Sequence, residues 1–231
     1  MTKPIYLLST GLVPAGVIEK AAQKGITLDA LAFIHIENLG DAEEMKGLAG
    51  RPLVVAFTSV NAVNAVQRWV PGPTGWRVYC ISGATCGAVV ALFGAAAVVG
   101  KARSAGQLAE TIIRQETGRE ILFFCGDHRR EELPSILRRA GFSVVEEVVY
   151  RTLLTPHKVE RNYDGIAFFS PSAVESFFSV NETAAGTPLF AIGPTTAAAI
   201  RARCTNPVIT AGEPDRAMLI GKMTDHFINK R

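Results

Sequence analysis

The sequence predicts an α/β protein: two similar parallel-sheet α/β domains, one of them discontinuous, joined by a two-stranded hinge. Short apolar segments alternate with segments that begin like helices, which is typical of parallel strands connected by helices. The chain also repeats itself. Shifted by 111 positions, from 57 to 168, Phe57–Val63 aligns with Phe168–Val174 without a gap. At the same shift, Val78–Thr85 aligns with Leu189–Thr196.

A third pair of segments aligns at that shift, Ser104–Leu108 with Asp215–Leu219. Each repeated unit contains a short apolar strand, a turn of glycine, serine or proline, and a helix that opens with small residues. A chance resemblance between alanine-rich helices is the alternative. Three separate motifs at one ungapped shift favour a duplicated α/β unit instead.

The repeat continues from the end of the chain to its beginning. Residues 120–152 contain an apolar strand, a glycine turn, a helix that ends in glycine and a second apolar strand. The same pattern occurs in residues 4–37 when Gly141 is set over Gly25. One copy of the unit is therefore expected to be assembled from both ends of the chain.

These alignments predict the domain boundaries. We expect residues 1–36 and 153–231 to form the discontinuous domain one, and residues 37–150 to form the inserted domain two. The chain then crosses between the domains twice, near Ile34–Ile36 and near Val149–Arg151. Two extended segments side by side would make the expected hinge.

Composition and charge exclude several classes of function. The chain has 231 residues, of which 48% are hydrophobic and 19% charged, as in ordinary globular proteins. Its net charge of +3, from 24 basic and 21 acidic residues, is small for a sequence-independent nucleic-acid binder, so no nucleic-acid partner is expected. A small anionic ligand is compatible with that charge.

Hydropathy predicts no membrane attachment. The longest weakly polar stretch, Cys86–Gly100, falls short of the roughly 20 apolar residues of a membrane span and predicts a helix followed by a strand. The apolar run Ile5–Leu8 is too short for the core of a signal peptide. We therefore expect a soluble, cytoplasmic protein.

The cysteines and histidines give no sign of a metal site. The four cysteines are scattered without a Cys-x-x-Cys pair, and the four histidines are far apart. Most of the cysteines lie in or just after apolar runs, where a free thiol packs as a small hydrophobic group. We expect reduced thiols and no metal.

Two strand-to-helix turns carry hydroxyl groups in one pattern. "AFFSPSAVESFF" at 167–178 begins as an apolar strand, breaks at Ser-Pro-Ser and continues as a helix, and "AFTSVNAVNAVQ" at 56–67 behaves similarly. In open parallel sheets, ligands bind at the carboxyl ends of the strands, where the first helical turn favours anions. The hydroxyl residues at or near such turns are Ser59, Thr85, Ser170, Ser172, Thr195 and Thr196.

Helix capping is the alternative for each of these residues, because serine and threonine are preferred caps in any protein. The set as a whole favours binding. Four hydroxyl-bearing turns, two in each domain, would face one cleft if the domains oppose each other. Such a cleft would hold several carboxylates or phosphates with neutral donors.

One turn is basic. Arg129 and Arg130 follow the apolar strand Ile121–Cys125 and are candidates to pair with a ligand carboxylate. The alternative is that they pair with Glu131 and Glu132 on a solvated helix face. The sequence contains no standard phosphate-binding motif and no nucleophile with a placed base. An enzyme of this kind would fold its substrate in a cleft, with at most one general acid.

The motifs together resemble one family. "FFSPSAV", "FAIGPTTAAAI", "FFCGDHRREELPSILRRAGF" and "VYRT" are similar in sequence and order to uroporphyrinogen-III synthases. Weaker matches are "AFTSVNAV", "ISGATCGAV", "KARSAGQLAE" and "AGEPDRAML". The resemblance covers nearly the whole chain. It implies two α/β domains joined by a two-stranded ladder, with the active site in the cleft between them.

The resemblance also implies an activity. The substrate would be hydroxymethylbilane, a linear tetrapyrrole with eight carboxylates. The enzyme removes water, inverts the last pyrrole ring and closes the macrocycle as uroporphyrinogen III, a step of haem biosynthesis. No cofactor or metal is implied, and we expect a monomer.

By position, the resemblance places substrate contacts on Ser59, Asn61, Ser82, Gly83, Thr85, Gly126, Arg130, Ser170, Ser172, Thr195 and Thr196. It places a proton donor on Tyr150, for which packing within the hinge is the alternative. One rival function is a non-catalytic two-domain binder of a small polyanion, which would share the same cleft. A second is a phosphosugar or nucleotide enzyme of similar layering.

Overall fold

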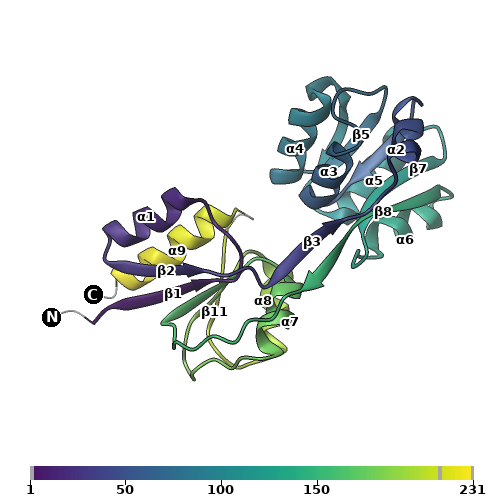
Figure 1. The fold of residues 1–231 in the computed structure, drawn as a ribbon. Coiled ribbons are helices and arrows are strands. Elements are labelled where there is room, and N and C mark those ends of the chain that lie inside the picture. The colour runs from purple at the N-terminus through teal and green to yellow at the C-terminus, as the bar shows by residue number, and fades with distance from the viewer. Residues whose placement is uncertain (1–2, 213–214, 230–231) are drawn as a thin grey trace. The chain divides into compact units, whose positions relative to one another are not determined.

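The computed structural model describes residues 3–212 and 215–229 (Figure 1). Glu213 and Pro214, which belong to the "AGEPDRAML" motif, lie outside the described residues. The chain divides into two compact units. Unit 1 contains the chain up to His35 and again from Leu153, and unit 2 is Ile36–Thr152.

Unit 1 is built on a five-stranded sheet whose neighbouring strands are all parallel, in the order β11-β10-β9-β1-β2. Its strands are β1 Ile5–Ser9, β2 Ile26–Ala30, β9 Gly165–Phe168, β10 Leu189–Ala191 and β11 Val208–Thr210. Its helices are α1 Ala15–Gln23, α7 Pro171–Phe178, α8 Pro194–Arg201 and α9 Arg216–Ile228.

Unit 2 contains the sheet β3-β8-β7-β4-β5-β6, in which β8, β7, β4, β5 and β6 pair in parallel. Its strands are β3 Ile34–Asn38, β4 Val54–Phe57, β5 Arg77–Ile81, β6 Val98–Ala102, β7 Glu120–Gly126 and β8 Ser143–Leu154. Its helices are α2 Ala42–Ala49, α3 Val60–Gln67, α4 Ala84–Phe93, α5 Ala105–Gln115 and α6 Glu132–Arg139, with a short 3₁₀ helix at Ala95–Ala97.

The two sheets have the same strand order when strands are matched through the sequence repeat. β4, β5 and β6 correspond to β9, β10 and β11, whereas β7 and β8 correspond to β1 and β2. Both sheets then follow one order, and this confirms two similar parallel α/β units. In each, the strand order reverses once, between β4 and β7 in unit 2 and between β9 and β1 in unit 1.

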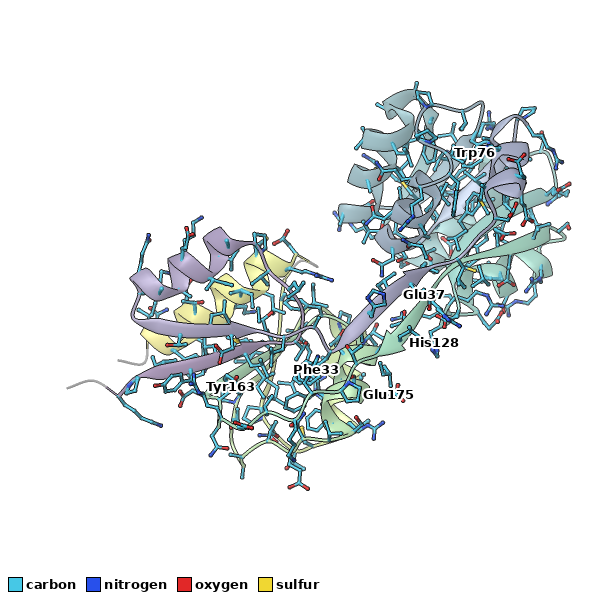
Figure 2. All side chains as sticks on the ribbon, viewed as in Figure 1. Phe33, Glu37, Trp76, His128, Tyr163 and Glu175 are labelled. Carbon is cyan, nitrogen blue, oxygen red and sulfur yellow. The ribbon has the colours of Figure 1, made fainter. Side chains whose placement is uncertain are left out.

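The central strands β4, β7, β9 and β10 are buried on both faces of their sheets, which explains why they are almost continuously apolar. In β4 and β7 of unit 2, alternate residues contribute to different cores. Phe57 and Phe124 pack with residues of α3 and α4, whereas Ala56 and Phe123 pack with residues of α5 and α6. Trp76, labelled in Figure 2, packs on the first of these cores with its ring centroid 5.4 Å from that of Phe124.

Unit 1 has the same layering. Phe168 and Leu189 pack with residues of α7 and α8 on one face of the sheet, and Ala167 and Phe190 pack with residues of α9 on the other. Figure 1 shows α1 and α9 together on this second face. Packing in these cores therefore fixes the position of the helix that follows each strand. It also fixes the position of the turn between the carboxyl end of the strand and that helix.

The boundary between the units falls within β3 and within β8, which are hydrogen-bonded neighbours. In unit 2 the Leu39 N–H donates to the Val149 carbonyl at 2.8 Å. In unit 1 the Thr155 N–H donates to the Phe33 carbonyl at 3.0 Å. The two crossing segments are thus paired with each other on both sides of the boundary, as expected of a two-stranded connection.

Candidate active site

The candidate site of unit 2 lies where β4 and β7 end side by side. In open α/β sheets, ligands bind at the carboxyl ends of the two strands between which the order reverses. Ser59 lies two residues after the end of β4, and Gly126 is the last residue of β7. The site is therefore described from these two strand ends.

Ser59 is the N-cap of α3. Its Oγ accepts a hydrogen bond from the Asn61 N–H at 3.1 Å, which satisfies one backbone donor of the first helical turn. The hydroxyl of Tyr150 donates to the same oxygen, also at 3.1 Å. A serine on one strand end and a tyrosine from β8 are thus joined in one hydrogen-bonded group.

Tyr150 reaches Ser59 by crossing over β7. Gly126 is its partner in the β7–β8 ladder, next to a register shift after Cys125. A Cβ on residue 126 would lie 2.6 Å from Cε2 of the tyrosine ring and 2.8 Å from its hydroxyl oxygen. Only glycine lets the ring lie flat against the backbone at this point, so Gly126 decides where Tyr150 is held.

The turn after β7 is fastened to the same part of β8. The Asp127 N–H donates to the carbonyl of Tyr150 at 3.1 Å, and the Asp127 carboxylate accepts from the Thr152 N–H at 3.1 Å. The carboxylate also accepts from the His128 N–H at 2.9 Å. These bonds fix the backbone on both sides of Tyr150.

Burial raises the pKa of the Tyr150 hydroxyl, and the nearby Cys125 and Asp127 raise it further. Hydrogen bonds with Ser59 and Asn61 act in the opposite direction without reversing the shift. Tyrosine already ionises near pH 10 in the unfolded chain. Tyr150 therefore keeps its proton at neutral pH and can act as a donor.

Arg129 is held by protein carboxylates. Its guanidinium contacts Glu131 at 2.7 Å and also Glu146 of β8, which in turn binds Arg138 at 2.6 Å. Pairing with Glu131 was the alternative left open by the sequence, and it is correct for Arg129. Pairing with Glu146 was missed, because nothing local connects residues 129 and 146. Arg130 is exposed in the same turn.

The helices that follow β5 and β10 begin differently from α3. α4 and α8 have glycine caps, Gly83 and Gly193, and neither cap residue accepts a side-chain hydrogen bond. Gly83 has φ +87°, a left-handed conformation that side chains rarely adopt. The N-cap residue of these two helices therefore supplies no side chain to the first-turn N–H groups, and such helix starts can bind anions.

Comparison with known proteins agrees with this geometry. The sequence profile of the family described as uroporphyrinogen-III synthase HemD matches residues 16–221. This chain belongs to the uroporphyrinogen-III synthase family. No curated protein sequence matches the chain.

Solved structures with the fold of this family resemble the chain along nearly its whole length. A mutant uroporphyrinogen III synthase from the extreme thermophile Thermus thermophilus is 16% identical, with a TM-score of 0.64, over 98% of this chain and 100% of that one. Uroporphyrinogen-III synthetase from Helicobacter pylori 26695 is 16% identical, with a TM-score of 0.65, over 96% and 99%. These structures show that the fold is that of the synthase family.

The remaining residues expected from the synthase family resemblance occupy the corresponding strand ends. Ser170 caps α7 and accepts from the Ala173 N–H at 3.1 Å, just as Ser59 caps α3. Thr85 and Thr196, which align in the repeat, are buried residues, 7% and 3% exposed. Ser172 is half-buried in the first turn of α7. Ser82 lies in the turn before α4, and Thr195 lies in the first turn of α8.

Arg216 was missed by the sequence analysis. It is the first residue of α9, yet its guanidinium lies over the Phe169 ring, 5.1 Å from the centroid, and donates to the Leu12 carbonyl at 3.4 Å. Phe169 follows β9 and Leu12 follows β1, so the charge lies where the strand order of unit 1 reverses. No local signal links residues 12, 169 and 216. The sequence suggested only neutral donors in this half of the chain.

Proposed function

We propose that this chain acts as a uroporphyrinogen-III synthase, which cyclises and dehydrates hydroxymethylbilane with inversion of the last pyrrole ring. The observation that supports this most directly is the family match over residues 16–221. The reaction belongs to porphyrin and haem biosynthesis, and the enzyme is a cyclising lyase. The substrate supplies several carboxylates, and both units place uncapped helix starts at the carboxyl ends of their strands.

We assign the carboxylates of the substrate to these turns. The backbone N–H groups at the starts of α4 and α8 would bind them, assisted by the hydroxyl groups of Ser82 and Thr195. Arg216 would add one charge-assisted contact in unit 1. Arg130 stays a candidate for the same role in unit 2, and the guanidinium of Arg129 contacts Glu131 and Glu146.

Tyr150 is the proton source in this proposal. The leaving group is a hydroxide unless it receives a proton, and departure as water is easier. Asp127 is less suited to this role because its carboxylate is already engaged as the acceptor of the backbone N–H groups of His128 and Thr152. Tyr150 is protonated and held at the strand ends by Gly126 and Ser59.

Other parts of the proposal concern the setting of the enzyme. We propose a monomer without nucleic-acid partners. The described residues contain no helix that is long and apolar enough to cross a bilayer. The four cysteines are all free thiols, which is usual in a reducing compartment, and this supports a cytoplasmic location.

The deciding experiment uses enzymatically prepared hydroxymethylbilane as the substrate. The purified protein should convert it mainly to the type III isomer, whereas the bilane alone closes to type I. Chromatographic separation of the two isomers measures the outcome. Formation of type I alone, at the uncatalysed rate, would favour the rival function, a non-catalytic binder of a small polyanion.

A further inference from the structure

The two hydrogen bonds that the Ser59 oxygen accepts leave only its hydroxyl proton available for a further contact. A serine hydroxyl has two acceptor positions and one proton. The Asn61 N–H fills one acceptor position and the Tyr150 hydroxyl fills the other, each at 3.1 Å. What remains is the Ser59 proton itself. Ser59 is therefore prepared to donate and not to accept.

The hydroxyl of Tyr150 has no similar freedom. Its ring is held against the backbone of Gly126, and its hydroxyl proton is directed at Ser59. Both residues are half-buried at the end of β4, and Ser59, whose two acceptor positions are filled, can offer a substrate only its proton.

We propose that Tyr150 delivers its proton through Ser59, so that Ser59 is the group in contact with the leaving hydroxyl. This inference rests on the proposed synthase function and changes the residue that touches the substrate. Tyr150 then acts through Ser59 and is a positioning and proton-supplying residue.

The proton transfer balances without any further reactant. As the carbon–oxygen bond breaks, its electron pair goes to the leaving oxygen, which takes the Ser59 proton and departs as water. The electrons of the pyrrole ring stabilise the carbon that is left. Ser59 takes the proton of Tyr150, and the resulting phenolate regains a proton, through solvent, when the closed macrocycle loses the proton that restores its pyrrole rings.

The local structure favours this direction of transfer. Ser59 is at the start of α3, where the helix dipole and the unpaired N–H groups stabilise negative charge. Charge that develops on either oxygen is therefore next to the positive end of a helix, and Asn61 can donate to the phenolate. Asp127 and Cys125 are the ionisable groups that raise the pKa of Tyr150 and oppose its ionisation.

The second copy of the repeat shares only half of this arrangement. Ser170 aligns with Ser59 and caps its helix in the same way, through the Ala173 N–H at 3.1 Å. In the alignment that sets Gly141 over Gly25, however, Tyr150 falls on Ile34, which has no hydroxyl group. The cap therefore belongs to the repeated unit, whereas the serine–tyrosine pair distinguishes unit 2.

The test compares Ser59→Ala, Ser59→Thr, Tyr150→Phe and the double variant Ser59→Ala/Tyr150→Phe. Ser59→Ala and Tyr150→Phe should each lower kcat by about 10- to 1000-fold with KM little changed, since general acid catalysis is usually worth about 10² to 10⁴. The double variant should be no slower than the slower single variant, because both changes interrupt one pathway. Ser59→Thr keeps the hydroxyl group and should restore most of the rate.

Ser104→Ala is the matched control for the lost helix cap. Ser104 caps α5 of the same unit by accepting from the Gln107 N–H at 3.3 Å, and its loss should leave kcat unchanged. A Ser59→Ala enzyme that keeps nearly the full kcat while Tyr150→Phe loses it would overturn the relay and make Tyr150 the direct donor. A double variant whose loss of kcat equals the product of the two single losses would also overturn the relay. Failure of the synthase function itself would be seen separately, as a wild-type protein that yields only the type I isomer.

Discussion

The aromatic ring of Tyr150 lies against the backbone of Gly126, so close that a Cβ on residue 126 would stand 2.6 Å from ring atom Cε2. The two residues are partners in neighbouring parallel strands, at a shift in the ladder. Because Gly126 of β7 has no side chain, the side chain of Tyr150 on β8 can reach Ser59. Strand pairing, not sequence proximity, brings the proposed proton source to the end of β4.

Gly126→Ala should displace Tyr150. The added methyl group cannot fit beneath the ring, so the variant should lose about 1–3 kcal/mol of stability, as overpacked sites do. It should also lose at least about tenfold in kcat, because the hydroxyl of Tyr150 leaves Ser59. Urea unfolding and steady-state kinetics measure the two effects.

Gly47→Ala is the control for that change. Gly47 lies within α2, where a Cβ would meet nothing within 4 Å. This variant should gain up to about 1 kcal/mol of stability, the usual advantage of alanine in a helix, and should keep full activity. A Gly126→Ala enzyme with normal kcat would show that the position of the Tyr150 ring does not matter for the reaction.

Substrate binding should be distributed over many neutral donors. Ser170→Ala removes one hydroxyl and should raise KM by only about threefold to tenfold, as expected for a neutral hydrogen bond worth about 1 kcal/mol. Stability should fall by about 0.5–2 kcal/mol, because the cap of α7 is lost. Complete loss of turnover in a folded Ser170→Ala protein would contradict distributed binding.

Arg216 should contribute through its charge. Arg216→Ala should raise KM by about tenfold or more at low salt, since charge-assisted bonds are worth about 1.5–3 kcal/mol, and the effect should shrink as salt screens the charge. The KM of Arg216→Lys should lie between those of the wild type and Arg216→Ala, because lysine keeps the charge and loses the planar stacking on Phe169. KM measured at two ionic strengths tests both variants.

Arg203→Ala serves as the control for Arg216. Arg203 is exposed between α8 and β11, at the opposite end of the parallel strands, and its removal changes the net charge equally. Equal changes of KM in Arg203→Ala and Arg216→Ala would mean that only the overall charge of the protein matters.

Alkaline pH should destabilise the protein through its tyrosines. Burial, followed by the hydrogen bond to Asp29, raises the pKa of Tyr163 to about 12. In the unfolded chain this group ionises near pH 10. Between these values the folded state holds a proton that the unfolded state has lost, so stability is full below about pH 10 and falls as pH rises towards 12.

Tyr163→Phe tests this assignment. Urea unfolding at pH 9 and pH 11 should show a smaller loss of stability in the variant than in the wild type, since the phenol that binds Asp29 at 2.8 Å is absent. The pKa of Tyr150 is also raised, so part of the loss should persist. Identical losses in the two proteins would show that Tyr163 ionises normally.

The sequence by itself determined the parts of this protein that depend on neighbouring residues. Apolar strand segments, glycine and proline punctuation and the repeated pattern predict the α/β elements, because strand and helix signals are local. The caps on α3 and α7 follow from a serine immediately before the first helical residue, so Ser59 and Ser170 were found from the turns alone. Family membership followed from the order of the same local motifs.

Only the tertiary structure decided which side chains meet. The sequence analysis listed Thr85 and Thr196 among the hydroxyl residues at the turns, and the structure shows that both residues are buried. Glu146 forms an ion pair with Arg129, and Arg216 donates a hydrogen bond to the carbonyl of Leu12, which follows β1. Tyr150 lies over Gly126 and donates a hydrogen bond to Ser59. Each of these contacts joins neighbouring strands or helices that are distant in sequence. Their geometry depends on ladder register and helix packing, which no pattern of adjacent residues specifies.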